Sequence, residues 1–290
     1  MSVFKLHKDE GFGDSVEVTL TRDIKEEQLQ NWAPFKNWKS TLRTNLEAQA
    51  DPKHVHNLDP YSLQSITIQS VDWFGNRIGF IKLYAEIQNS KTDLPGIAFL
   101  RGGSVAVLMV LRPEGTKDER YVIMTEQPRI PAGSLRFLEI PAGMLDGEVG
   151  FRGKAADEID EETGIKIRAE ELIDLTGLAL KNSKVQDELQ PAMYPSAGGS
   201  DEFIPIYLWE KEMDRQRIVD LQGQLTGKRM QGEMITLKVT DYEELWREGA
   251  RDAKTLAAWA LYEGLSRAGI LQPEIDRLKK ASGSSTPIES

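Results

Sequence analysis

A turn-forming segment that leads into an acidic helix, residues 139–165, is the feature that most constrains the fold of this chain. Residues 139–147 read Glu-Ile-Pro-Ala-Gly-Met-Leu-Asp-Gly, and the Pro, the two Gly and the Asp are turn formers. Residues 154–163 predict a helix, with Gly153 before its first turn and Gly164 at its C-terminal stop. The sequence therefore predicts a strand end, a tight turn and a loop that lead into one short helix.

The predicted helix carries three carboxylates on one side. At about 100° per residue, Glu161 and Glu162 lie within about 60° of Glu158, and small and apolar residues form the neighbouring face. Like charges at this spacing repel each other, and a hard cation would remove that repulsion. Mg²⁺ suits the pattern because it binds through a few carboxylates and keeps waters and phosphates as its other ligands. The alternative is a solvated acidic helix face.

This segment resembles the Nudix box, the signature of hydrolases that act on nucleoside diphosphates linked to another group. The positions that match at the box spacing are Gly143, Glu158, Ile159, Glu161, Glu162, Gly164 and Ile165. Two positions depart, because Val149 stands for the first Glu, beside Glu148, and Asp157 stands for the Arg. In the family these two side chains tend to pair, so losing both leaves no buried charge alone. Lys154 could pair with Asp157 instead.

Composition limits the classes of partner and compartment. The chain has 290 residues, 40% of them hydrophobic and 28% charged, as in a soluble globular protein. No run approaches the roughly 18 apolar residues of a membrane span, and Met1–Glu10 has no apolar signal-peptide core. The chain has no cysteine, which excludes disulfides, and its net charge of −10 argues against a polynucleotide partner. We expect a cytoplasmic protein that acts on a small molecule, without membrane or polynucleotide partners.

The first third of the chain predicts a small sheet with helices. A strand is expected at residues 16–20, a helical stretch broken near Pro34 at 24–48, and a hairpin of strands 65–73 and 78–87. Trp32, Phe35, Trp38 and Leu42 recur every three or four residues, as packing residues do. His54 and His56 lie in a loop without a third metal ligand nearby.

The rest of the chain predicts a mixed sheet between helices. Residues 105–111 are apolar throughout, so that strand should be covered on both faces. Further strands are expected at 121–127, 137–140, 172–176, 204–209 and 234–239, and a helical stretch at 241–269 that Gly249 could split. We expect an N-terminal region at 1–94, the main domain at 95–275 and a disordered tail at 276–290.

The resemblance implies an α/β/α Nudix sandwich with a mixed sheet, preceded by a smaller N-terminal antiparallel sheet region. It extends to plant-type ADP-sugar pyrophosphatases, in short pieces that cover roughly residues 65–270. These pieces are residues 71–77, 95–97, 101–102, 125–129, 198–202 and 244–247. In that branch the N-terminal region often helps to form a homodimer, which we expect here.

The resemblance also implies a metal site that takes Mg²⁺, with Mn²⁺ as the other candidate. Glu158 and Glu162 would be the primary ligands, Glu161 would assist directly or through water, and the backbone carbonyl of Ala142 would complete the shell. Gly143 would let the main chain bend close to the ion.

The remaining roles implied by the resemblance concern the base and the substrate. Glu202 would be the general base and Asp201 the second candidate; the alternative is a surface acidic pair. Arg129 would hold a phosphate with its fork-shaped guanidinium. Arg101 could contact substrate or form a surface salt bridge, and Trp73 could stack on adenine across a dimer interface or pack in the core.

The sequence thus predicts Mg²⁺-dependent hydrolysis of an ADP-sugar, ADP-ribose or ADP-glucose, to AMP and a sugar phosphate. The alternative is a Nudix-fold nucleotide-binding or regulatory module with weakened activity. Val149 and Asp157 favour this alternative, and the retained carboxylates favour the enzyme.

Overall fold

The computed structural model describes residues 2–6, 11–12, 15–116, 118–145, 150–184, 188–227 and 234–283. Its contacts divide the chain into two compact units. The first comprises Met1–Gly103, Val185–Gln190 and Ser196–Phe203, and the second comprises Ser104–Lys184, Pro191–Pro195 and Ile204–Ser290. The division falls at residues 103–104, nine residues beyond the boundary expected from the sequence, and two short segments after residue 184 return to the first unit.

The first unit is a six-stranded sheet with two helices. Its strands are β1 (Val3–Leu6), β2 (Val16–Thr19), β3 (Ser62–Phe74), β4 (Arg77–Gln88), β5 (Asp93–Leu94) and β6 (Ile97–Leu100). The order is β1-β2-β3-β4, with β5 and β6 both on β4, and every pairing is antiparallel except β2 with β3. The expected antiparallel sheet is thus present with one parallel pair.

Helices α1 (Glu26–Asn31) and α2 (Ala33–Ala48) follow β2, and Pro34 begins α2 as expected. Phe35 of α2 is fully buried, and Trp32, Trp38 and Leu42 pack against the same core. The prediction that these aromatic residues pack is confirmed.

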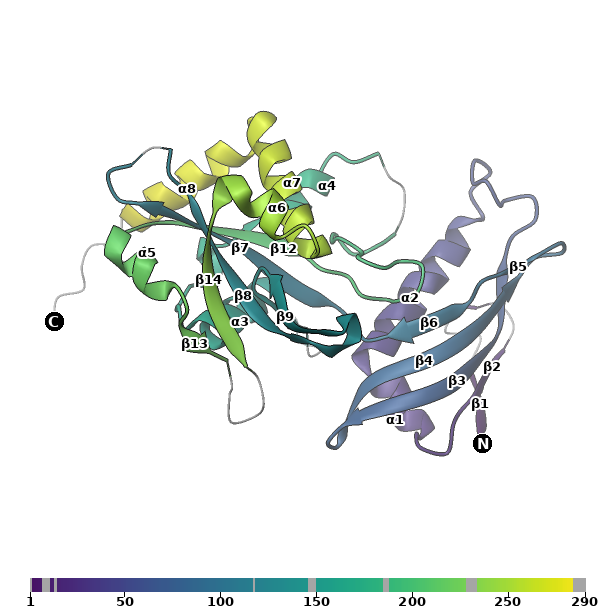
Figure 1. The fold of residues 1–290 in the computed structure, drawn as a ribbon. Coiled ribbons are helices and arrows are strands. Elements are labelled where there is room, and N and C mark those ends of the chain that lie inside the picture. The colour runs from purple at the N-terminus through teal and green to yellow at the C-terminus, as the bar shows by residue number, and fades with distance from the viewer. Residues whose placement is uncertain are drawn as a thin grey trace. The chain divides into compact units, whose positions relative to one another are not determined.

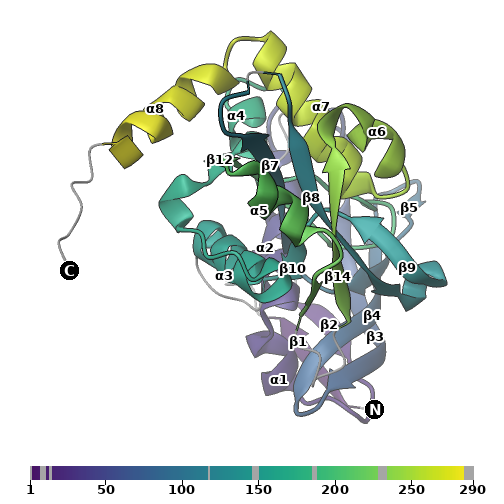
Figure 2. The ribbon, with the colours of Figure 1, turned by 60° about the vertical axis from the view of Figure 1, so that its left-hand side comes forward.

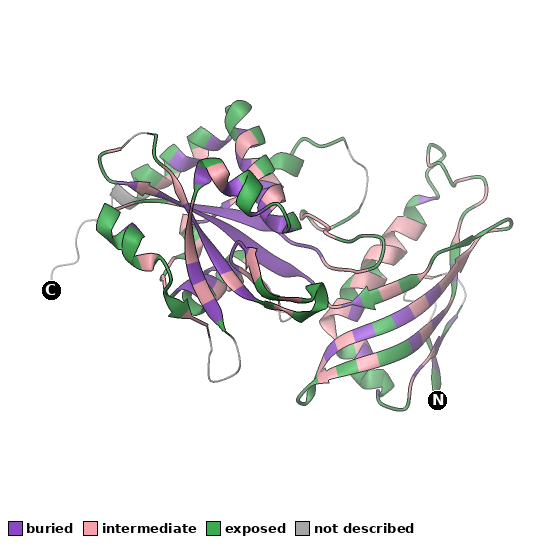
Figure 3. Ribbon diagram, in the orientation of Figure 1, coloured by how far each residue is buried: buried purple, intermediate pink, exposed green. Residues whose placement is uncertain are grey.

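The strands β3 and β4 of this hairpin extend beyond the predicted strands at all four ends, and the hairpin turns at Gly75, whose φ of 65° suits glycine. Ile81, Leu83 and Ala85 are buried, while the residues between them are half-buried or exposed (Figure 3). This period of two places one face of the sheet on the core and leaves the other face open.

The second unit is an eight-stranded mixed sheet. Its strands are β7 (Ser104–Pro113), β8 (Tyr121–Arg129), β9 (Ser134–Glu139), β10 (Ala142–Met144), β11 (Ile173–Asp174), β12 (Ile206–Met213), β13 (Leu225–Thr226) and β14 (Ile235–Asp241). The order is β11-β12-β7-β8-β14-β13, with β10 on β7 and β9 on β8. Strand β7 lies between β12, which is parallel, and β8, which is antiparallel.

Strand β7 is buried on both faces, as its apolar run predicts. Ala106, Leu108 and Val110 face one core, and Val107 and Met109 face the other. Helices α4 (Leu175–Leu180), α6 (Leu245–Glu248), α7 (Ala253–Arg267) and α8 (Leu271–Gly283) cover the first face. Helices α3 (Phe151–Thr163) and α5 (Arg215–Leu221) cover the second (Figures 1 and 2). The expected α/β/α sandwich is confirmed.

Several element boundaries differ from the predicted ones. Helix α3 begins at Phe151 rather than after Gly153, and it ends at Gly164 in the left-handed conformation, as predicted. The predicted strand 172–176 stops at Asp174, because this side chain accepts a hydrogen bond from Gly177 N and caps α4. Residues 276–283, expected in a disordered tail, belong to α8.

The C-terminal helical region is split at Gly249, as predicted, between α6 and α7. Short 3₁₀ turns occur at Ile130–Ala132, Ala169–Glu171 and Tyr242–Glu244. In the part of the chain that the structure describes, no helix combines the length and apolarity needed to cross a membrane.

Candidate active site

The carboxylate of Glu162 is bound to the turn that precedes α3. Its Oε2 accepts a hydrogen bond from Ala142 N at 3.0 Å, and its Oε1 lies 3.4 Å from Gln127 Nε2. The side chain is buried, with 4% of the residue exposed. The resemblance implied that the Ala142 carbonyl and the Glu162 carboxylate would lie close together around a metal. The structure shows the two residues close together, in a hydrogen bond that the Ala142 N–H donates.

Gly143 provides the space for Glu158, one helical turn before Glu162. A Cβ added to Gly143 would lie 1.9 Å from Glu158 Cδ, so the carboxyl group packs directly on the main chain. This glycine is thus required for the close approach that the sequence predicted. Glu158 and Glu162 therefore gather on one turn, at Ala142–Gly143.

The ammonium group of Lys154 lies beside the Glu158 carboxylate. Its Nζ lies 2.8 Å from Glu158 Oε1, four residues along α3. The sequence had suggested a pair of Lys154 with Asp157, whereas the ion pair that the structure shows for Lys154 is with Glu158, the predicted metal ligand. Asp157 is exposed. Val149 and Glu148, the other departures from the box, lie outside the described residues.

Burial sets the protonation of Glu162. Removal from water is the largest cause that raises the pKa of this carboxyl, the nearby charges of Glu139 and Glu158 act in the same direction, and the resulting pKa is about 8. The hydrogen bond from Ala142 N and the charge of Arg129 act in the opposite direction. Because a divalent cation favours the ionised form, a metal at this turn would displace the proton of Glu162.

Glu139 is a third carboxylate at the turn and was not predicted as a site residue. It ends β9, is 2% exposed, and binds Arg129 Nε through Oε1 at 2.6 Å. Its Oε2 contacts the ammonium of Lys254 on α7. The signal in the sequence was its place directly before the turn, but its second cationic partner, Lys254, lies 115 residues away.

Arg129, predicted to hold a phosphate, ends β8 beside this turn. Its side chain is 40% exposed, and its Nε is bonded to Glu139. The guanidinium therefore lies at the edge of the carboxylate group, anchored on its buried side. Its phosphate-binding role stays a prediction.

The chemistry of these donors fits a hard cation, since Glu158 and Glu162 are carboxylates held at a main-chain turn. Glu161, expected to assist, is exposed on α3. Among the residues with described positions, no three His, Cys, Asp or Glu side chains form a ready-made metal site. The structure thus brings Glu158, Glu162 and Ala142 together, with Lys154 where the cation would act.

The predicted general base and its alternative lie in the first unit. Glu202 Oε1 forms an ion pair with Arg101 NH1 at 2.9 Å, and both side chains are largely buried. Asp201 accepts hydrogen bonds from Arg101 N at 2.8 Å and Gly102 N at 3.1 Å, and burial raises its pKa. Asp201 thus holds a main-chain turn, which leaves Glu202 as the better candidate. Trp73 is half-buried on β3.

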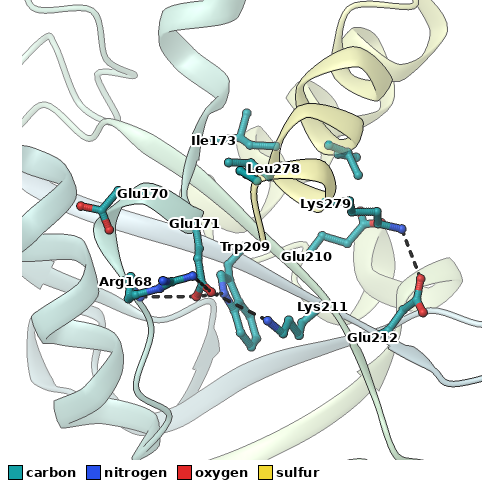
Figure 4. Close-up of a pocket in the computed structure, with 12 residues that line it drawn as sticks. Arg168, Glu170, Glu171, Ile173, Trp209, Glu210, Lys211, Glu212, Leu278 and Lys279 are labelled. Carbon is teal, nitrogen blue, oxygen red and sulfur yellow. Dashed lines mark hydrogen bonds and ion pairs between the residues drawn. The ribbon is translucent and has the colours of Figure 1, made fainter. Parts of the chain in front are cut away.

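A pocket of about 590 Å³ lies elsewhere in the second unit, between β12, the 3₁₀ turn at 169–171 and α8 (Figure 4). Its β12 residues 209–212 pair with residues 109–112 of β7, whereas Ala142 pairs with Ala106 at the other end of that strand. None of the predicted site residues lines it.

No protein-family model matches the chain. The chain is 39% identical to Nudix hydrolase 14, chloroplastic, of Arabidopsis thaliana over 251 residues, which make up 86% of this chain and 75% of that protein. This chain belongs to the Nudix hydrolase family. It is therefore a hydrolase, and the predicted membership of the Nudix family is confirmed. The chain is also similar to a crystal structure of an ADP compounds hydrolase, at 17% identity and a TM-score of 0.41; the match covers 72% of this chain and 98% of that one.

The raised pKa of Glu162 predicts a pH-dependent stability in the presence of a chelator. Between its ordinary pKa of 4.5 and about 8 the folded protein holds a proton that the unfolded chain has lost. This contribution to stability is complete below pH 4.5 and is lost as pH rises through about 8. Glu162→Gln cannot titrate, so its melting temperature relative to wild type should increase from pH 5.5 to 8.5. Parallel curves of melting temperature against pH for Glu162→Gln and wild type would contradict this assignment. Glu170→Gln, at an exposed position, is the control.

A methyl group at Gly143 should displace Glu158 from the turn, because it would overlap the Glu158 carboxyl. We expect Gly143→Ala to fold, since a side chain can rotate away, but to lose about tenfold or more in turnover. Gly153→Ala is the matched control on α3, because a Cβ there meets no atom within 4 Å. Circular dichroism and turnover of the two variants compare fold and activity. Equal turnover of both would show that the close packing at Gly143 is not needed.

Proposed function

We propose that this Nudix hydrolase cleaves the diphosphate of ADP-sugars such as ADP-ribose and ADP-glucose in a Mg²⁺-dependent reaction. The observation that supports the proposal is the gathering of Glu158 and Glu162 on the turn at Ala142–Gly143. Family membership supports hydrolysis of a nucleoside diphosphate derivative. The ADP-sugar is proposed from the short sequence pieces shared with plant-type ADP-sugar pyrophosphatases.

The residues then have the following roles. Glu158 and Glu162, with the carbonyl of Ala142 and assistance from Glu161, would hold Mg²⁺ or Mn²⁺, which supplies charge neutralisation at the diphosphate when bound. Lys154, which pairs with Glu158 Oε1, would compete with the cation for that carboxylate. Arg129 would hold a phosphate with the part of its guanidinium that is not bonded to Glu139.

Glu202 is the proposed general base, and its ion pair with Arg101 orients its carboxylate. It would take a proton from a water whose oxygen bonds to one phosphorus. The bond from that phosphorus to the bridging oxygen breaks, which gives AMP and a sugar phosphate. Arg101 is then a positioning residue, and a direct contact with the sugar phosphate is its other proposed role.

A binding or regulatory module is the second candidate function. The observation that favours it is the ion pair of Lys154 with Glu158, which adds to the replacements at Val149 and Asp157. A bound lysine competes with the metal and would weaken catalysis. The enzyme is favoured because both box carboxylates remain at the turn.

We also propose a homodimer that forms through the open face of the first unit's sheet. Exposed apolar residues on this unit include Phe74, Ile97 and Phe99, at 41%, 59% and 37% exposure. Phe80 joins Phe74 and Phe99 in one ring cluster, with centroids 5.0 and 5.1 Å apart. Trp73, at the end of β3, would contact the partner or its adenine in such a dimer. The proposed compartment is the cytoplasm, with no polynucleotide or membrane partner.

Metal dependence and the role of Glu162 are tested by AMP release from ADP-ribose. Wild type should release AMP with Mg²⁺ and stop in excess chelator. Glu162→Gln should fold normally and lose about a hundredfold or more in turnover, because one charged ligand is gone. Glu170→Gln, an exposed control, should match wild type. Nucleotide binding without AMP release by wild type would favour the binding module, and full activity of Glu162→Gln would remove the metal assignment.

The dimer is tested by a charge on the open face. Phe99→Lys should shift the protein to monomers in analytical ultracentrifugation, since a buried unpaired ammonium is costly at an interface. Leu58→Lys is the control, because Leu58 is 99% exposed in a loop of the same unit. A wild-type protein that sediments as a monomer would contradict the proposed assembly.

A further inference from the structure

The first turn of α7 places three buried polar side chains against the Nudix-box turn. They are Asp252, the N-cap residue, with Lys254 and Thr255, which are exposed by only 6%, 9% and 0%. Buried lysines are rare, because removing an ammonium from water is costly unless it is paired. The position of this lysine therefore calls for an explanation beyond packing.

Thr255 fixes the main chain at the start of the turn. Its hydroxyl donates to Asp252 Oδ2 at 2.5 Å and accepts from Ile140 N at 3.0 Å. Ile140 lies two residues before Ala142, whose N–H binds Glu162. The helix cap of α7 is thereby hydrogen-bonded to the backbone that carries the carboxylates.

Lys254 fixes a side chain at the same place. Its ammonium contacts Glu139 Oε2 and lies 3.0 Å from Asp252 Oδ1. The other oxygen of Glu139 holds Arg129 Nε at 2.6 Å. A continuous series of charged contacts thus runs from buried Asp252 through Lys254 and Glu139 to the half-exposed guanidinium of Arg129.

Lys254 and Arg129 each bind one oxygen of the Glu139 carboxylate. Lys254 compensates the buried charge of Glu139, so Arg129 binds that carboxylate through Nε alone. Guanidinium carries five N–H donors, so those of the two terminal nitrogens are not used in the hydrogen bond to Glu139, and the side chain is 40% exposed. Without Lys254, Glu139 would draw the whole guanidinium inward to satisfy its buried charge.

We propose that Lys254 is a positioning residue of the active site, which holds Glu139 and through it orients Arg129 toward the diphosphate of the substrate. The proposal rests on the proposed function in one respect, namely that Arg129 binds the diphosphate. It adds a residue of α7 to the proposed active site, far from the Nudix box in sequence.

The test compares six variants with wild type, one of which is a control. Lys254→Met removes the charge and keeps the length, and Lys254→Arg restores a charge. The double variant Glu139→Gln with Lys254→Met removes both buried charges together, which protects the fold if Lys254→Met alone is unstable. Arg129→Ala and Arg129→Ala with Lys254→Met complete a double-mutant cycle. Lys238→Met is the control, because Lys238 pairs with Glu126 at 3.9 Å and has no place in the site.

Two quantities are measured on folded protein. The first is the affinity for ADP-ribose in chelator, by titration calorimetry, which requires no turnover. The second is kcat and KM for AMP release with Mg²⁺. We expect Lys254→Met and the Glu139→Gln double variant to bind ADP-ribose about tenfold more weakly and to raise KM more than they lower kcat. Lys254→Arg should return to within about threefold of wild type, as should Lys238→Met.

The double-mutant cycle decides between positioning and general stability. If Lys254 acts through Arg129, Lys254→Met should change the affinity little once Arg129 is already alanine. Additive losses, or unchanged binding in the stable Glu139→Gln double variant, would overturn the proposal.

The outcomes also separate this inference from the proposed function. If wild type releases no AMP but binds ADP-ribose in a Lys254-dependent way, the proposed function fails and the positioning role stands. If wild type hydrolyses ADP-ribose and Lys254→Met equals it in both measurements, the positioning role fails alone. A wild type that neither binds nor hydrolyses ADP-ribose overturns both.

Discussion

Compensation of buried negative charge beside one turn is the constraint on which the second unit depends. Glu139, Glu158 and Glu162 lie around Ala142–Gly143, and each has a different compensating group. Glu139 has Arg129 and Lys254, Glu158 has Lys154, and Glu162 has a main-chain N–H and a raised pKa. Burying carboxylates is costly without such partners, so the turn, helix α3 and helix α7 must form together.

The two helical layers of the sandwich carry the charged and polar residues that meet at this turn. Strand β7 is buried on both faces, and the box turn pairs with its first residues through β10. Helix α3 brings two carboxylates from one side of the sheet, and α7 brings a lysine and a threonine from the other. The candidate site thus lies near the start of β7, where residues of both helical layers meet. The apolar cores on the two faces of the sheet hold these layers in place.

The sequence predicted the parts of this arrangement that depend on local pattern. The apolar run of β7, the hairpin of β3 and β4, the split at Gly249 and the glycine at Gly164 all follow from periodicity and turn chemistry. The shared helix face of Glu158 and Glu162 also follows from their spacing, whereas their approach to the turn was expected from the resemblance to the Nudix box.

The parts that the sequence did not predict depend on contacts between distant segments. Lys254 and Glu139 are 115 residues apart, and nothing in either neighbourhood marks one as the partner of the other. The ion pair of Lys154 with Glu158 rather than Asp157 depends on which helix face packs on the sheet. Strand 172–176 was overestimated because its apolar run continues into α4, where Asp174 as the cap decides the boundary.

The hydrogen bond from Ile140 N to Thr255 has a consequence for synthesis of the chain. The ribosome adds Ile140 of the turn first and adds Thr255, which accepts its hydrogen bond, 115 positions later. At about 5–20 residues per second, the nascent turn waits roughly 6 to 23 seconds for that partner. Until α7 has been synthesised, Glu139 lacks its contact with Lys254 and the turn lacks its hydrogen bond to Thr255, so the candidate site is completed only after residue 255 has been added.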